Sequence, residues 1–224
     1  MPYSFIEQGS NYTQSGPWQT PAFTNADQTS DTIFVFGVYG AASGTNTPTD
    51  LAGNTYVSVG ITTGGANIHA YVCQNPAAYT SNQVSITFTS GNAGGLTAVK
   101  IRGLNQSIAP QYVGNDQNPA TTGTDGITST TLTPASQPGC LLGFDYKRAY
   151  NAGTPVAGTG FGDYSAIANY NTTRTASNED KRITSLSAVA ATFTDSTGGG
   201  TDEYITVALY VPELSTVLMG QILT

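Results

Sequence analysis

The side chains that could support nucleophilic chemistry in this sequence are few. His69 is the only histidine, and Cys73 and Cys140 are the only cysteines, so a general base would have to be His69. Along a strand, Cys73 lies about 13 Å from His69, which is beyond hydrogen-bonding distance. These three side chains also lack the spacing of a zinc motif. The sequence therefore predicts no catalytic residue and no zinc site, and it leaves open whether the cysteines are bridged or are buried thiols.

Acidic residues offer oxygen ligands and acid–base groups in several short segments. Residues 50–54, 114–118, 178–180 and 195–203 combine Asp or Glu with Asn, Thr or Gly. None matches the EF-hand or the nonapeptide calcium repeat, and Asp and Asn favour turns because their side chains bond the local backbone. A glycosidase would need two carboxylates at a fixed separation, which no motif here indicates. We therefore expect turns, with no metal, no cofactor and no enzymatic activity.

The low charge of the chain narrows the class of partner. Charged residues make up 9% of the sequence and the formal net charge is −7, against a usual charged fraction of about 25%. The Lys and Arg residues form no cluster, so we expect no nucleic-acid partner. The first residues lack a secretory signal, and residues 211–224 are shorter than the ~20 residues that span a bilayer, so we expect no membrane partner. A surface of uncharged polar residues suits a protein that works outside cells or within an assembly.

The elements that must position these residues are strands. Residues 32–40 are apolar on both faces, which predicts a central strand covered on two sides. Residues 55–61 and 83–90 alternate, and in the first of these Val57, Val59 and Ile61 share one face. The other predicted strands are 67–73, 96–104, 126–133, 139–148, 183–194 and 203–211, separated by turn clusters. No helical pattern and no repeat of fixed period is found, so the fold class is all-β: an antiparallel two-sheet sandwich, jelly-roll-like.

Three regions follow from this pattern. Residues 1–30 form an N-terminal arm, 31–211 the β-sandwich domain, and 212–224 an apolar C-terminal arm. The N-terminal arm is rich in aromatic residues, so it packs on its own sandwich or on a neighbouring subunit. The candidate subunit-interface residues are Tyr3, Phe5, Tyr12, Trp18, Leu214, Leu218, Met219 and Ile222.

One turn carries a resemblance to a known group of proteins. Asp50, Gly53, Asn54 and Tyr56 give the pattern D-x-x-G-N-x-Y between two strands, and "GCLLGFDYKR", "GTGFGDY" and "ITVALYV" follow in the second half. Over residues 31–211 this order resembles a β-sandwich module of tailed-phage virion proteins and bacterial surface proteins. In physical terms we expect a structural turn, because Gly53 permits positive φ, Asn54 tolerates it and the Asp50 carboxylate accepts backbone N–H groups.

The resemblance implies a non-enzymatic structural protein of a tailed-phage virion. Within that class, the single domain, the uncharged polar surface and the candidate arms at both ends lead us to expect a capsid decoration (cement) or head-fibre subunit on the particle surface. Its expected partners are other virion proteins and further copies of itself, as a homo-oligomeric trimer. Two alternatives stay open: a receptor-binding tail-fibre domain that contacts cell-surface glycan, and a secreted carbohydrate-binding module. The 13 Tyr residues, with many Asn and Gln, supply the aromatic faces and amides that sugars bind.

Overall fold

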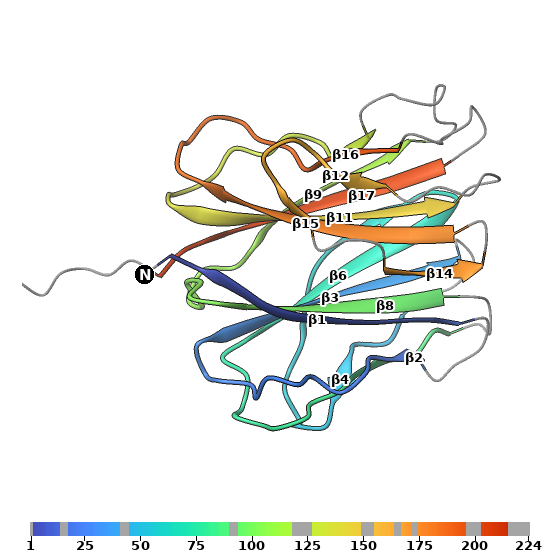
Figure 1. Ribbon diagram of the computed structural model, residues 1–224, viewed down its shortest axis with the longest axis vertical. Coiled ribbons are helices and arrows are strands. Elements are labelled where there is room, and N and C mark those ends of the chain that lie inside the picture. Colours follow the sequence, from blue (N-terminus) through green and yellow to red (C-terminus); the bar gives the residue numbers. More distant parts are fainter. Residues whose placement is uncertain are drawn as a thin grey trace, which may run out of the picture.

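The computed structural model describes residues 2–13, 18–40, 45–89, 94–117, 127–148, 155–163, 167–171, 174–195 and 203–214. In these residues the fold is all-β, as predicted, and its strands pair antiparallel in sheets that stack as a sandwich (Figure 1). No helix in the described ranges is long and apolar enough to cross a membrane.

A five-stranded and a six-stranded sheet form the centre of the molecule. The strand order of the first is β1 (Ser4–Thr13), β8 (Gly94–Arg102), β3 (Asp31–Gly40), β6 (Ala66–Gln74) and β5 (Val57–Thr63). The order of the second is β13 (Gly162–Asp163), β15 (Arg174–Ile183), β11 (Gly139–Arg148), β17 (Glu203–Pro212) and β9 (Gln111–Gln117), with β14 (Ile167–Asn171) also paired to β15.

A small sheet covers the outer face of each large one. Strands β2 (Trp18–Gln19), β7 (Val84–Ile86) and β4 (Thr49–Asp50) cover the first sheet, and β10 (Ile127–Thr128), β16 (Thr192–Thr194) and β12 (Val156–Ala157) cover the second. The result is four layers, with one apolar core between the large sheets and one beneath each small sheet (Figure 1).

The strongest strand signals of the sequence are confirmed and others are corrected; of the predicted strand at 126–133, only Ile127–Thr128 forms β10. β3 lies in the middle of its sheet and is buried along nearly its whole length, as its two apolar faces predicted. The predicted strand at 183–194 is wrong, because β15 ends at Ile183 and only Thr192–Thr194 forms β16. The alternation in 55–61 also misleads, since a bulge between Ser58 and Gly60 interrupts β5, and Val57 and Ile61 are exposed.

The structure contains a duplication that the sequence pattern did not show. Strands β1 to β8 have the order β1-β8-β3-β6-β5, and β9 to β17 repeat it as β9-β17-β11-β15-β13, while β2-β7-β4 corresponds to β10-β16-β12. Equivalent strands begin about 108 residues apart, for example Asp31 of β3 and Gly139 of β11. The large sheets therefore come from two halves of one topology that face each other.

Matching hydrogen bonds in the two halves support this equivalence. The Thr20 N–H donates to the Val84 carbonyl at 2.8 Å, and the Val84 N–H donates back to Thr20 Oγ1 at 3.0 Å. In the second half, the Ser129 N–H donates to the Ala191 carbonyl at 3.0 Å, and the Ala191 N–H donates to Ser129 Oγ at 3.1 Å. Most residue types differ between the halves, so the hydrogen-bond pattern is the feature they share.

The central core joins the halves through a pair of equivalent aromatic rings. Phe36 is the sixth residue of β3 and Phe144 is the sixth residue of β11. Their rings stack with centroids 4.6 Å apart and an angle of 4° between the planes, and both side chains are fully buried. The stack therefore fixes how the two sheets are placed over each other.

Replacing either ring should destabilise the protein and uncouple the halves. We expect Phe36→Ala and Phe144→Ala each to cost about 3–5 kcal/mol, because each leaves a cavity in the central core. The double variant should cost less than the sum of the two, since ring stacking couples them by about 1 kcal/mol. Urea unfolding checks this, with Phe36→Leu as the milder control; strictly additive losses would contradict the coupling.

The outer core of the second half buries a charged cluster beside the apolar residues. Burial raises the pKa of Asp145 to about 8, and the carboxylates of Glu179 and Asp195 add to the rise. A hydrogen bond from Thr206 and the Lys147 ammonium act in the opposite direction. Asp145 Oδ2 has no hydrogen-bond partner in the described part of the chain. The folded protein therefore favours the neutral carboxylic acid at position 145.

This shift predicts a stability that falls as the pH rises. An unfolded Asp ionises near pH 4, whereas folded Asp145 retains its proton up to about pH 8. Between these values the folded state binds the extra proton, so stability is lost with rising pH. Asp145→Asn, which is neutral at every pH and can still accept from Thr206, should melt a few degrees higher than the wild type at pH 8. Near pH 4 the difference should vanish, and an equal difference at both pH values would refute the assignment.

Candidate functional site

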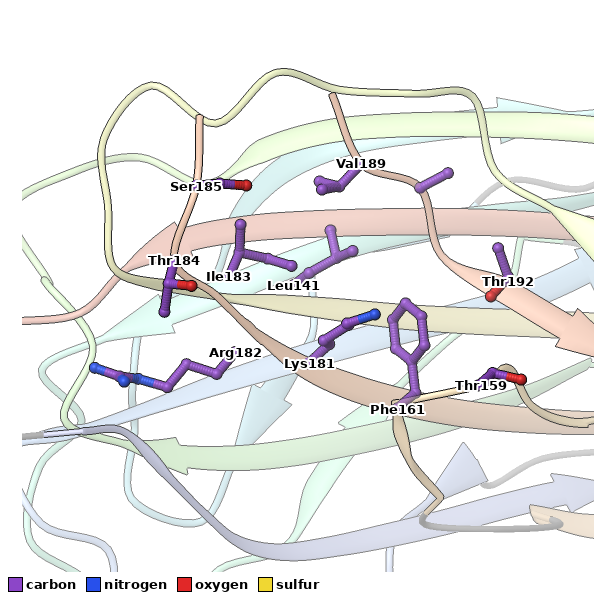
Figure 2. A pocket seen from close by; sticks show the side chains of 11 residues that line it. Leu141, Thr159, Phe161, Lys181, Arg182, Ile183, Thr184, Ser185, Val189 and Thr192 are labelled. Carbon is purple, nitrogen blue, oxygen red and sulfur yellow. The ribbon is translucent and has the colours of Figure 1, made fainter. Parts of the chain in front are cut away.

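The pocket that stands out lies on the outer face of the second sheet, beneath the connection from β15 to β16. It has a volume of about 420 Å³, within the range of ~300–1,000 Å³ typical of small-ligand sites. β11 and β15 supply its floor, residues 184–192 form one wall, and the turn before β13 supplies another (Figure 2). The site thus depends on three segments that only the sheet register brings together.

Apolar side chains and hydroxyl groups line different parts of this pocket. The buried side chains of Leu141 and Ile183 lie between the two walls, with Val189 above them in the view of Figure 2. The hydroxyl-bearing residues in the lining are Thr159, Thr184, Ser185 and Thr192. A ligand here would meet an apolar surface on one side and hydroxyl groups around it.

Lys181 supplies the charge of the pocket. Its Nζ lies over the Phe161 ring, 4.8 Å from the centroid, and Figure 2 shows the two side chains next to each other. Among the cationic side chains that the structure describes, Lys181 alone has no carboxylate partner. The others form the pairs Lys100–Asp27, Arg102–Asp31, Lys147–Asp195, Arg148–Glu203 and Arg182–Glu213.

Arg182 also lines the pocket, but its guanidinium is engaged elsewhere. Arg182 Nε and Nη2 donate to the two carboxylate oxygens of Glu213 at 2.5 and 2.9 Å, and in Figure 2 the side chain extends away from Phe161. A bidentate pair of this kind holds the guanidinium in one geometry. Lys181 is therefore the cation available to a ligand.

In the first half of the molecule the equivalent space is filled. Strand β5 corresponds to β13, and β6 corresponds to β15. Val57 of β5 pairs with Val72, and Gly162 of β13 pairs with Asp180 at the equivalent position. The residues just before β5 and β13, Tyr56 and Phe161, are therefore equivalent. By the same register, Cys73 corresponds to Lys181. Tyr56 and Cys73 are both buried in the apolar core of the first half, whereas Phe161 and Lys181 are half-buried. The same topology is thus stable with this space closed, and the second half keeps it open.

The predicted turn residues close the space in the first half. Gly53 has a φ of +72°, and the Asp50 carboxylate accepts hydrogen bonds from the Asn54 N–H, Tyr56 Oη and Asn82 Nδ2 at 2.9, 2.8 and 3.0 Å. Burial raises the pKa of Asp50, but these hydrogen bonds outweigh it and lower the pKa overall. The turn is therefore a structural anchor that ties three segments together.

Removing this anchor should destabilise the first half. We expect Asp50→Ala to cost about 3 kcal/mol, because the Tyr56 hydroxyl loses its acceptor and the Asn82 amide loses one of its two, keeping only Asp27. Leu51→Ala is the matched control, since Leu51 is the adjacent residue and is 53% exposed; it should be neutral within about 0.5 kcal/mol. Thermal unfolding measures both, and a neutral Asp50→Ala would show that the hydrogen bonds are dispensable.

His69 lies in a cluster of hydroxyl groups on the outer face of the first sheet. Its Nε2 is 2.7 Å from Ser58 Oγ, and its Nδ1 is 3.0 Å from Thr45 Oγ1 and 2.8 Å from Tyr71 Oη. Burial lowers the pKa of His69, which favours the neutral imidazole. A serine–histidine pair normally has a carboxylate on the far nitrogen, and in the described residues only hydroxyl groups contact that nitrogen. The sequence did not indicate Ser58 or Thr45, because only the strand register brings them to His69.

The candidate interface residues of the N-terminal segment contact this chain's own cores. Tyr3, Phe5 and Tyr12 belong to or precede β1 and pack against the central core, and Trp18 is buried under the first sheet. Tyr3 Oη also donates to Asp180 Oδ2 of the second sheet at 2.5 Å. Residues 4–13 are thus an edge strand rather than a separate arm. Leu214 is 55% exposed, and Leu218, Met219 and Ile222 lie outside the described residues.

The cysteine and acidic side chains of the described residues do not come together in a metal site. Cys73 and Cys140 are free thiols in different cores, and burial raises the pKa of Cys73 to about 12. Within the described ranges, no three His, Cys, Asp or Glu side chains are grouped so that they could hold a metal ion. Glu179, from one of the acidic segments, instead accepts the backbone N–H groups of Gly158 and Thr192 at 2.9 and 2.8 Å.

Comparisons with known proteins do not place the chain in a family. No protein-family model matches this sequence, and a search of curated proteins finds no similar chain. The surface and the pocket of the protein itself are therefore the basis for its function.

Proposed function

We propose that this protein is a non-enzymatic structural subunit of a tailed-phage virion, carried on the particle surface as a capsid decoration (cement) or head-fibre protein. The observation that supports this role is a set of exposed apolar side chains at one end of the sandwich. Tyr79, Ile108, Leu186 and Leu214 are 39%, 39%, 52% and 55% exposed. Large apolar side chains that gather at one end of a domain mark a surface made for a partner.

These four residues lie in segments that leave the same end of the two large sheets. They follow β6, β8, β15 and β17, which all end beside the first residues of the antiparallel strands β3 and β11. The two sheets meet there through the Leu104–Glu213 bridge. Pro2 and Leu214 both lie next to Gly103 at this end. Figure 1 marks the N-terminus there.

The remainder of the surface suits a permanent component of a particle. Five of the described cations are neutralised in ion pairs, and charged residues form only 9% of the sequence. Charged groups therefore cover little of this surface. Attachment would then depend on apolar contact at the end that carries Ile108 and Leu214, with further copies of the chain and other virion proteins as partners.

Particle composition and occupancy test this proposal. Mass spectrometry of purified virus particles from the genome that encodes the chain should detect it, and its absence would overturn the virion role. The double variant Ile108→Ser/Leu214→Ser should lose occupancy on particles by tenfold or more. Ile61→Ser is the matched control, because Ile61 is 47% exposed but lies within β5. Equal occupancy of both variants would show that the protein attaches by another surface, and analytical ultracentrifugation tests the proposed trimer.

A second function, recognition of cell-surface glycan by a receptor-binding domain, is favoured by the pocket of the second half. Its apolar floor, surrounding hydroxyl groups and aromatic ring at Phe161 are features of sugar-binding sites, and its equivalent in the first half is filled by Tyr56. Binding of soluble protein to cells or to a glycan array, with competition by free sugar, would distinguish this function from a purely structural role.

A further inference from the structure

We propose that the pocket between Lys181 and residues 184–192 binds a carboxylate-bearing sugar, such as a uronic or sialic acid residue of a surface glycan. This inference deepens the glycan-recognition function proposed above and rests on it. Three features of the molecule support it: the Lys181 ammonium without a carboxylate partner among the described residues, the apolar and hydroxyl-bearing sides of the lining, and the closed equivalent space in the first half.

The charge of the pocket selects an anion. Lys181 Nζ contacts the Phe161 ring at 4.8 Å and has no carboxylate partner in the part of the chain that the structure describes. This is unusual in a protein of net charge −7 that pairs its other described cations. A hydrogen bond between an ammonium and a carboxylate contributes more than one between neutral groups. A ligand carboxylate would therefore complete the environment of Lys181.

The lining selects a ring with one apolar face and several hydroxyl groups. Leu141, Ile183 and Val189 offer aliphatic contact, and Phe161 provides the aromatic edge of the site (Figure 2). The hydroxyl-bearing residues Thr184, Ser185 and Thr192 can donate to and accept from ligand hydroxyl groups. A pyranose carries both kinds of surface, whereas a simple carboxylate such as acetate would leave most of the 420 Å³ empty.

The duplicated topology shows that this arrangement is not needed for folding. At the equivalent positions the first half has Tyr56, which is 4% exposed, and Cys73, which is 2% exposed. An apolar residue at the position of Lys181 is thus compatible with this fold. The second half instead places an ammonium there, half-buried beside Phe161, and burial of part of a charge is disfavoured unless a partner is gained.

Titrations of the isolated full-length chain test the inference by NMR or calorimetry. The probes are glucuronate, N-acetylneuraminate, glucose as the neutral sugar and acetate as the simple anion. We expect saturable binding of at least one acidic sugar, at least tenfold tighter than glucose or acetate. Acetate binding as tight as the acidic sugars would overturn the sugar assignment, and no binding of any anion would overturn the site.

Variants separate the pocket from general charge effects. Lys181→Met should weaken acidic-sugar binding about tenfold, since it removes one charge-assisted hydrogen bond, whereas Lys181→Arg should retain most of it. Arg148→Met is the matched control: it changes the net charge equally, and Arg148 pairs with Glu203 away from the pocket. Equal losses in Lys181→Met and Arg148→Met would contradict the site. Because no particle is needed, a negative result here leaves the virion role standing, and absence from particles leaves this result unaffected.

Discussion

Each large sheet of this protein must be covered on both of its faces, and this constraint shapes the rest of the structure. The inner faces cover each other, with Phe36 and Phe144 stacked at equivalent positions of the two central strands. The outer faces cannot be left in water, because β3 and β11 are buried on both sides. A three-stranded sheet therefore lies over each outer face and encloses a second and a third core. Burial of these apolar surfaces is the main source of the stability of such a stack.

Both halves of the chain cover the outer face of a large sheet with the same arrangement of strands. The residues beneath the covering sheets differ between the halves, and the pocket lies where they differ. The halves share strand order and backbone hydrogen bonds, such as those of Thr20 with Val84 and of Ser129 with Ala191. The spaces beneath their outer sheets differ. In the first half Asp50, Tyr56 and Asn82 close the space with hydrogen bonds, whereas the second half leaves a pocket lined by Phe161 and Lys181. Comparison of equivalent positions in the two halves therefore indicates which features the fold requires, because a feature present in only one half is not needed for folding.

The polar strand β15 shows why part of the fold could not be predicted from the sequence. β15 reads RTASNEDKRI and pairs with β11 on one side and with β13 and β14 on the other, yet its Ser177, Asn178 and Glu179 are fully buried. Two of these side chains bond to the overlying segments: Glu179 accepts two backbone N–H groups, and Ser177 Oγ donates to the Pro155 carbonyl. A run of polar residues gives no strand signal in the sequence, because such partners are distant along the chain. In the edge strand β5 the alternation predicted one shared face for Val57 and Ile61, but the bulge turns Ile61 to the other face. Local periodicity cannot anticipate either effect, since both depend on a partner distant in sequence.

The sequence by itself determined the all-β class, the two-faced central strand at 32–40, the segments 139–148 and 203–211, and the turn residues at 50–54. These features arise from the alternation of neighbouring side chains and from local backbone preferences. Only the tertiary structure decided the duplication, the incorporation of residues 4–13 as an edge strand, the setting of His69 among hydroxyl groups and the pocket at Lys181. Each of these depends on which strands become neighbours and in what register, and that is set by the burial of whole sheets rather than by any single segment.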